Sequence, residues 1–100
     1  MQHKLHETGE EFVLRMHGKF THRDYADVLG IADRMVEART QRFVFDMDQL
    51  EFIDSAGIGM MLMILDIGQR HAIEVIIRNA HGATQAVVRN AHLDELFTVA

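Results

Sequence analysis

The sequence predicts an α/β fold, with a mixed β-sheet of about four to five strands flanked by about three main α-helices. Short apolar, β-prone segments alternate along the chain with longer segments whose apolar residues recur at helical spacing. Helices that separate strands in this way are typical of right-handed βαβ crossovers. No proline and no Ser/Gly tract interrupts the 100 residues, so we expect a single domain over residues 1–100.

Five segments are expected to form strands. The first two make an antiparallel hairpin whose turn contains Gly9, and Gly18 closes the second strand. The third strand is short and wholly apolar, which is typical of a strand covered on both faces, and a loop from Asp46 to Asp54 is expected to follow it. In chain order the expected strands are His3–His6, Phe12–His17, Phe43–Phe45, Ile73–Ile77 and Thr98–Ala100.

Three helices are expected between these strands. Thr21 followed by Asp24 makes an N-cap for a helix of about 18 residues that ends at Ala38. The apolar spacing predicts a second helix from Ser55 to about His71 and a third over Gly82–Asn90.

Composition excludes several classes of function. The net charge of −5, with no basic cluster longer than a pair, argues against nucleic-acid binding. The absence of cysteine excludes disulfides and thiolate metal sites. The longest apolar run, Ala56–Leu65, is far short of the ~20 residues that span a bilayer, so no membrane insertion is expected. Met1–Thr8 has no signal-peptide pattern, and we expect a cytoplasmic protein without a cofactor.

The turn from Asp54 to Gly59 carries most of the functional information. Strand-to-helix turns at the edge of such sheets are where binding sites gather. A helix N-terminus offers unpaired N–H groups that the Ser55 hydroxyl is placed to cap, or that would stabilise a phosphate on Ser55. Gly57 and Gly59 each cost the helix about 1 kcal/mol relative to alanine, which favours close approach of another group. The simpler interpretation is that Ser55 only caps and that both glycines only permit packing inside the domain.

The second helix is more apolar than a surface helix needs to be. One face is expected to enter the core, and a second apolar face would stay in water if only one layer covered the helix. Such a face usually marks a partner site, although helices on both sides would bury it. The expected core face is Ile58, Met61, Leu62 and Leu65, and the expected partner face is Met60, Met63, Ile64 and Ile67.

The strand at Phe43–Asp46, the hydrophobic residues Leu50 and Phe52-Ile53, and the turn Asp54-Ser55-Ala56-Gly57-Ile58-Gly59 together resemble the signature of STAS domains, the anti-sigma factor antagonists of bacteria. The resemblance extends over nearly the whole chain. It implies a STAS-like fold and a protein-binding switch that is not an enzyme. In single-domain members, a partner that is both serine kinase and anti-sigma factor phosphorylates the serine matching Ser55, and a metal-dependent serine phosphatase reverses this. The dephosphorylated form binds the partner and the phosphorylated form does not.

The resemblance and the helix pattern together define an expected site. Phosphorylation is expected at Ser55, where it would take the net charge from −5 to about −7. Many members have aspartate where this chain has Thr21, which is a departure from the family. No catalytic or metal-binding residue is expected. The expected partner-binding residues are Thr21, Asp54, Ser55, Ala56, Gly57, Gly59, Met60, Met63 and Ile64.

Other functions fit the sequence less well. Asp46-Met47-Asp48 is similar to the nucleophile loop of Mg²⁺-dependent aspartate phosphatases, but no lysine follows at a plausible place. Ser55 lacks the Gly-x-Ser-x-Gly elbow of a serine hydrolase. The seven histidines match no metal-ligand spacing. The main alternative is a STAS adaptor that is not phosphorylated and is held in a transporter or sensory complex.

Overall fold

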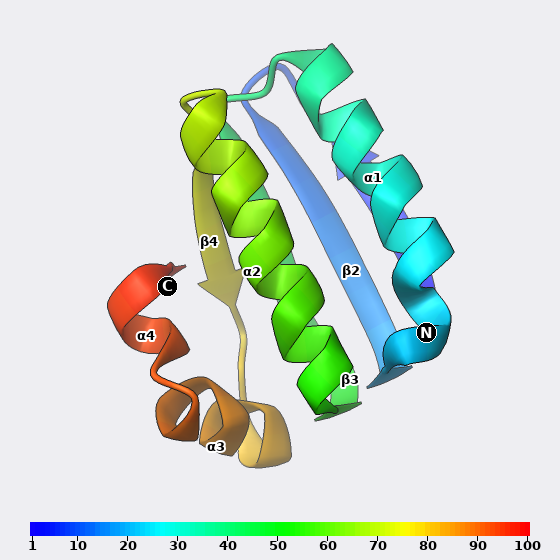
Figure 1. The fold of residues 1–100 in the computed structure, drawn as a ribbon, viewed down its shortest axis with the longest axis vertical. Helices are drawn as coiled ribbons and strands as arrows, with labels where there is room; N and C mark the ends of the chain where they lie inside the picture. The colour runs from blue at the N-terminus through cyan, green and yellow to red at the C-terminus, as the bar shows by residue number, and fades with distance from the viewer.

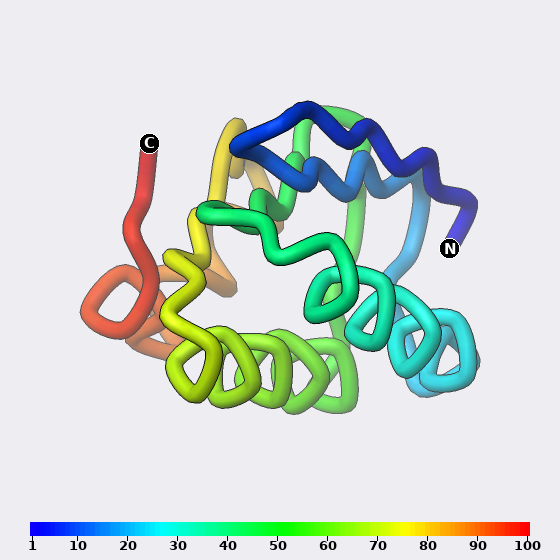
Figure 2. The backbone as a smooth tube through the Cα atoms, turned by 90° about the horizontal axis from the view of Figure 1, so that it is seen from above, coloured from blue at the N-terminus to red at the C-terminus, as the bar shows by residue number.

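The computed structural model describes residues 1–100 and shows one β-sheet with its helices on one side (Figures 1 and 2). Helices α1 and α2 lie side by side across the sheet. Helix α3 packs against β3 and α4, and α4 lies against β5. In chain order the elements are β1 (Gln2–Glu7), β2 (Glu11–Phe20), the 3-10 helix η1 (His22–Asp24), α1 (Tyr25–Ala38), β3 (Arg42–Ile53), α2 (Ser55–Arg70), β4 (Glu74–Arg78), α3 (Gly82–Asn90), α4 (Leu93–Leu96) and β5 (Thr98–Val99).

The strands follow one another across the sheet in the order β1-β2-β3-β4-β5. The β1–β2 pair is antiparallel, and the other three pairs are parallel. Parallel neighbours need crossover connections, which α1, α2 and α3 supply. The predicted mixed α/β fold is confirmed. None of the helices combines the length and the apolar character that a membrane span requires.

The expected loop from Asp46 to Asp54 is wrong, because β3 continues to Ile53. Likewise β2 does not end at Gly18 but runs to Phe20, and the two extensions pair in parallel up to Phe20 and Ile53. Two register shifts along this pair interrupt the alternation of inward and outward side chains. The buried residues of this part of β3 are Met47, Leu50 and Ile53, at every third position. Since a sequence without period two does not resemble a strand, the extension was missed.

The first helical segment starts as predicted but not as an α-helix. Thr21 and Asp24 form a capping box, in which the Thr21 N–H donates to Asp24 Oδ2 at 2.8 Å. The box closes the short 3-10 turn η1, and α1 itself begins at Tyr25. A further short helix, α4, was not expected from the sequence.

The main core lies between the sheet and the helices, and aromatic rings fill its centre. Phe43 stacks on Phe12 at 5.5 Å between ring centroids and meets Phe45 edge-on at 5.0 Å. The other face of the sheet has no helix over it (Figure 2). There, Arg42 donates to Glu10 and Glu11, and these hydrogen bonds raise the pKa of Arg42.

Gly18 shapes the last part of β2, which leads into η1 and α1. Gly18 lies at one of the register shifts and has a φ of +76°. No atom lies within 4 Å of the point where its Cβ would be. We expect Gly18→Ala to lower the free energy of unfolding by about 1–2 kcal/mol, because an L side chain is strained at positive φ. Gly9→Ala, in the β1–β2 turn and equally unobstructed, is the control and should change stability by less than about 0.5 kcal/mol. Urea unfolding of both variants tests this, and equal stabilities would contradict it.

Candidate partner-binding site

The first turn of α2 is tied directly to the end of β2. The Asp54 N–H donates to the Phe20 carbonyl at 3.1 Å, and Asp54 Oδ1 accepts from the Gly57 N–H at 2.7 Å. Asp54 is therefore the N-cap of α2. The expectation that Ser55 caps the helix is wrong, because the Asp54 carboxylate already occupies that position.

Gly57 is buried against β2 and β3. It is therefore not accessible to a partner, contrary to the prediction that it binds one. A Cβ at this position would lie 2.8 Å from both the Phe20 carbonyl oxygen and Ile53 Cγ2. Gly59 differs, because it is exposed and nothing lies within 4 Å of where its Cβ would be. Two residues along an α-helix are about 200° apart, so the two glycines face opposite ways. Gly57 therefore permits packing inside the domain, whereas Gly59 leaves space at the surface for another group to approach.

Ser55 is exposed at the tip of α2. Its hydroxyl has no hydrogen-bond partner in the protein, and the backbone N–H groups of Ser55 and Ala56 have no acceptor. Such free donors, with the positive end of the helix dipole, favour an anion at this point.

The buried face of α2 is only partly the predicted one. Met61 is fully buried as expected, and Ile58 and Leu65 are half-buried against the core. Met60 and Ile64, expected to face a partner, are only 5% and 1% exposed, whereas Leu62, expected in the core, is 38% exposed. Glycines near both ends of the helix cause this difference, because the side of the helix that carries them can approach the sheet more closely than any other side. Gly68, like Gly57, leaves no room for a Cβ, which would meet Val75 Cγ2 at 2.8 Å. The buried residues are Gly57, Met60, Met61, Ile64 and Gly68.

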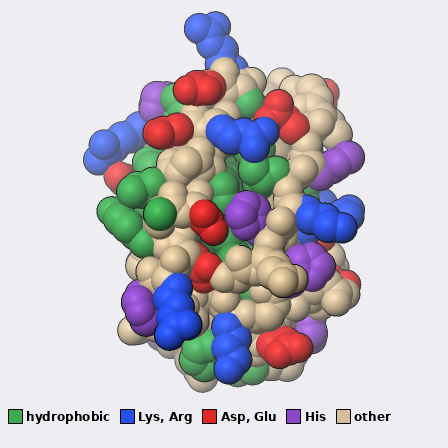
Figure 3. Space-filling model, turned by 90° about the vertical axis from the view of Figure 1, so that its right-hand side faces the viewer, with side chains coloured by type: hydrophobic (Ala, Val, Ile, Leu, Met, Phe, Trp, Pro, Cys, Tyr) green, Lys and Arg blue, Asp and Glu red, His purple; other side chains and the backbone are tan.

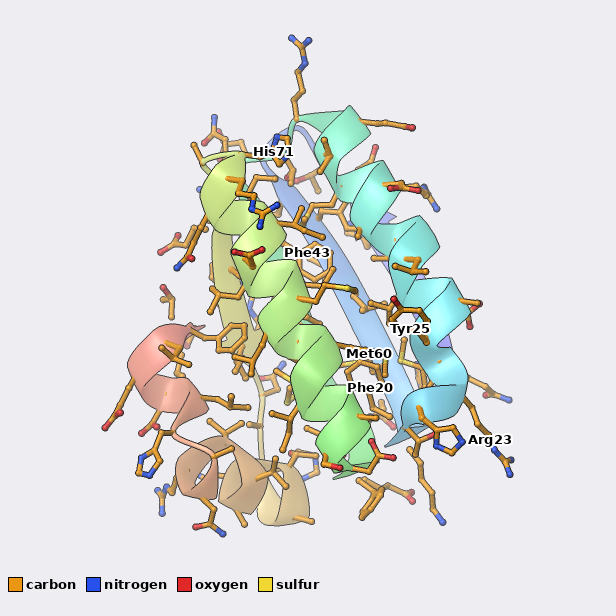
Figure 4. The ribbon with its side chains drawn as sticks, viewed as in Figure 1. Phe20, Arg23, Tyr25, Phe43, Met60 and His71 are labelled. Atoms are coloured by element: carbon orange, nitrogen blue, oxygen red, sulfur yellow. The ribbon has the colours of Figure 1, made fainter.

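A hollow of about 400 Å³, called here the apolar hollow, opens between the start of α1 and the first turns of α2. Tyr25 projects from α1 beside it and is 52% exposed, and Met60 lies toward the sheet (Figure 4). Four predicted site residues, Ala56, Gly59, Met60 and Met63, border it together. The full lining is His22, Tyr25, Ala56, Gly59, Met60 and Met63.

A second and more polar hollow, the basic hollow, has a volume of about 760 Å³ and borders the first at His22. Basic and histidine side chains gather at this end of the molecule (lower part of Figure 3). Its only carboxylate is Asp54, whose Oδ2 lies 4.0 Å from His22 Nδ1. Thr21 lies here and not in the apolar hollow. The lining is Met1, Gln2, His17, Gly18, Lys19, Thr21, His22, Arg23 and Asp54.

Sequence reasoning missed Tyr25 and the basic residues around this site. A usable signal existed, because His22 and Arg23 stand where a helix begins and where its dipole disfavours positive charge. Residues placed against local stability are candidates for function.

The model of the STAS domain family matches residues 2–100. The chain belongs to the STAS domain family. A STAS-domain containing protein of Pseudomonas aeruginosa (strain UCBPP-PA14) is 22% identical over an alignment 94 residues long, which covers 91% of this chain and 89% of that protein. The STAS fold is not that of a catalytic family.

Solved structures share this fold at low identity. The unphosphorylated anti-sigma factor antagonist SpoIIAA superposes with a TM-score of 0.79 at 18% identity, over 99% of this chain and 87% of that one. The phosphorylated SpoIIAA of Bacillus gives 0.77 at 20%, over 99% and 91%. A sulfate transporter family protein of Wolinella succinogenes gives 0.75 at 15%, over 92% and 74%.

The two glycines of the first turn of α2 predict opposite effects on stability. Gly57→Ala should lower the free energy of unfolding by about 1–3 kcal/mol, because its Cβ overlaps a backbone oxygen that cannot move freely. Gly59→Ala should raise it by up to about 1 kcal/mol, because alanine favours the helix and nothing obstructs it. Thermal and urea unfolding measure both, and a destabilising Gly59→Ala would show that this side of the helix is not open.

Proposed function

We infer that this protein is a phosphorylation-controlled protein-binding switch of the anti-sigma factor antagonist type. In this proposal the dephosphorylated form binds an anti-sigma factor that is also a serine kinase, phosphorylation of Ser55 releases it, and a serine phosphatase resets it, all in the cytoplasm. The observation that carries the proposal is the exposed, unpaired Ser55 hydroxyl on the same helix turn as the apolar hollow.

The geometry supports opposite affinities for the two forms. A partner that covers the apolar hollow also covers the tip of α2, so it must desolvate whatever Ser55 carries. A neutral hydroxyl costs little there, whereas a phosphate brings about two negative charges next to the partly exposed Asp54 carboxylate. A penalty of ~4 kcal/mol would weaken the complex about 1,000-fold. In the free protein the unpaired N–H groups of Ser55 and Ala56 stabilise the phosphate instead.

The similarity to SpoIIAA supports this proposal. SpoIIAA is an anti-sigma factor antagonist whose structure is known in both the unphosphorylated and the phosphorylated form. The two forms match this chain almost equally well, with TM-scores of 0.79 and 0.77. This similarity of the two forms supports a switch that acts through local charge and contact, without a change of fold.

A second candidate function is that of a STAS adaptor in a transporter or sensory complex. The structural similarity to a sulfate transporter family protein favours it. An adaptor of this kind binds its complex without phosphorylation. Intact-mass spectrometry of the protein from its native cells separates the two functions: a single phosphate mapped to Ser55 supports the switch, and its absence under all growth conditions supports the adaptor.

Charge at Ser55 should control affinity for the anti-sigma factor/serine kinase of the same cells. We expect Ser55→Ala to bind at least as tightly as the unmodified protein. Ser55→Asp should bind at least tenfold more weakly, because a carboxylate supplies about half to two-thirds of the phosphate's charge. Calorimetric titration measures both. Equal affinities of the two variants would contradict the proposed switch.

The apolar hollow should supply the contact. Met63 is half-buried at its border, so Met63→Lys should abolish binding and leave the unfolding transition cooperative. Leu62→Lys is the matched control, since Leu62 is an exposed apolar residue of the same helix outside the hollow. Met60→Lys does not serve, because Met60 belongs to the core. Weak binding by both Met63→Lys and Leu62→Lys would place the interface elsewhere on α2.

A further inference from the structure

Three basic residues surround the proposed switch without being used by the fold. Lys19, His22 and Arg23 are all exposed and line the basic hollow. Lys19 and Arg23 make no ion pair, and His22 has only the loose contact with Asp54 at 4.0 Å. Because the whole chain carries a net charge of −5, a local positive surface of this kind stands out from the rest of the protein.

The positions of His22 and Arg23 work against stability. They lie in η1, immediately before the N-terminus of α1. The N-terminal end of the helix dipole is positive, so it disfavours positively charged side chains. Acidic residues are the stabilising choice at this end of a helix, and Asp24 and Asp27 nearby conform to that rule. Two basic side chains at the least favourable end of α1 therefore indicate a role outside the folded monomer.

We propose that the basic hollow and the apolar hollow together bind an acidic protein segment that also carries one apolar side chain. The apolar side chain enters between Tyr25 and Met63, and flanking carboxylates pair with Lys19, His22 and Arg23. The two hollows share His22, so one continuous segment reaches both.

The shape and charge of the surface favour a protein segment over other anions. A small anion such as inorganic phosphate needs donors that converge on it, whereas these cations are exposed around a wide hollow of about 760 Å³. A nucleic acid would be repelled by the net charge of −5 and has no use for the apolar hollow. The inference rests on the proposed function in that Asp54 and Ala56, the chain neighbours of Ser55, line these two hollows, and it specifies the chemistry of the partner.

The test uses the full chain and defined probes. Amide spectra of ¹⁵N-labelled protein are recorded at low ionic strength during titration with a blocked EDLDE peptide, a blocked KKLKK peptide and inorganic phosphate. We expect saturable shifts from EDLDE only, confined to residues 17–25 and 54–63. Shifts from KKLKK of equal size, or shifts outside these residues, overturn the proposal. Equal shifts from phosphate at the same charge concentration show a general anion site and also overturn it.

Charge reversal supplies the matched comparison. Arg23→Glu should weaken EDLDE binding about tenfold, and its melting temperature should stay the same or rise, because a carboxylate suits this end of the helix. Arg39→Glu makes the same change in net charge at the opposite end of α1, where Arg39 is exposed and unpaired, and should leave binding unchanged. Equal weakening by both reversals would show only an effect of net charge, and would overturn the proposal.

These outcomes are separable from those of the Ser55 experiment. The peptide titration needs neither kinase nor phosphate on Ser55, so its failure leaves the proposed switch intact. Conversely, equal affinities of Ser55→Ala and Ser55→Asp for the anti-sigma factor would remove the switch and leave the acidic-segment site standing.

Discussion

The close contact between the first turn of α2 and the end of β2 is the constraint on which the site depends. The Phe20 carbonyl accepts from the Asp54 N–H at 3.1 Å, and Gly57 packs so tightly against Phe20 and Ile53 that any Cβ would overlap them. The β2–β3 pairing continues to Phe20 and Ile53, so the sheet itself carries this contact. Ser55 is therefore held at a defined point, with its hydroxyl in solvent and with the backbone N–H groups of Ser55 and Ala56 free. A modification at Ser55 changes charge at that point without needing to move the helix.

The same contact decides which side of α2 is buried against the sheet and which side stays at the surface. Gly57 and Gly68 bring the helix backbone close to the sheet, and Met60, Met61 and Ile64 between them fill the core. The residues left at the surface near Ser55 are small or flexible, so they border a hollow instead of a protruding apolar patch. A hollow excludes water from a partner's side chain more completely than a flat surface does. In the proposed switch, the contact with the partner and its control by Ser55 would both lie within two turns of one helix.

Charge around the tip of α2 shows a balance between stability and recognition. The fold places His22 and Arg23 in η1, at the end of α1 where the dipole disfavours positive charge, while the chain as a whole is acidic. Each such placement costs the monomer a few tenths of a kcal/mol to about 1 kcal/mol. Residues kept at this cost are expected where binding needs them. Asp54 takes part in both the fold and this charged surface, since one of its carboxylate oxygens caps α2 and the other lies toward His22.

Local sequence patterns predict the fold class and the order of the five strands and three main helices along the chain. They also predict the end of α1 at Ala38, all of α3, and Ser55 as the first residue of α2. These features depend on local periodicity and capping, which are written in neighbouring residues. Tertiary structure alone decided that β3 runs to Ile53, because bulges destroy the alternation that reveals a strand. It also decided which face of α2 is buried: periodicity counts large apolar residues, whereas the buried line follows Gly57 and Gly68, whose role is visible only against Phe20, Ile53 and Val75. The basic hollow likewise joins Lys19 and Arg23 to Asp54, residues that chain folding, not sequence proximity, brings together.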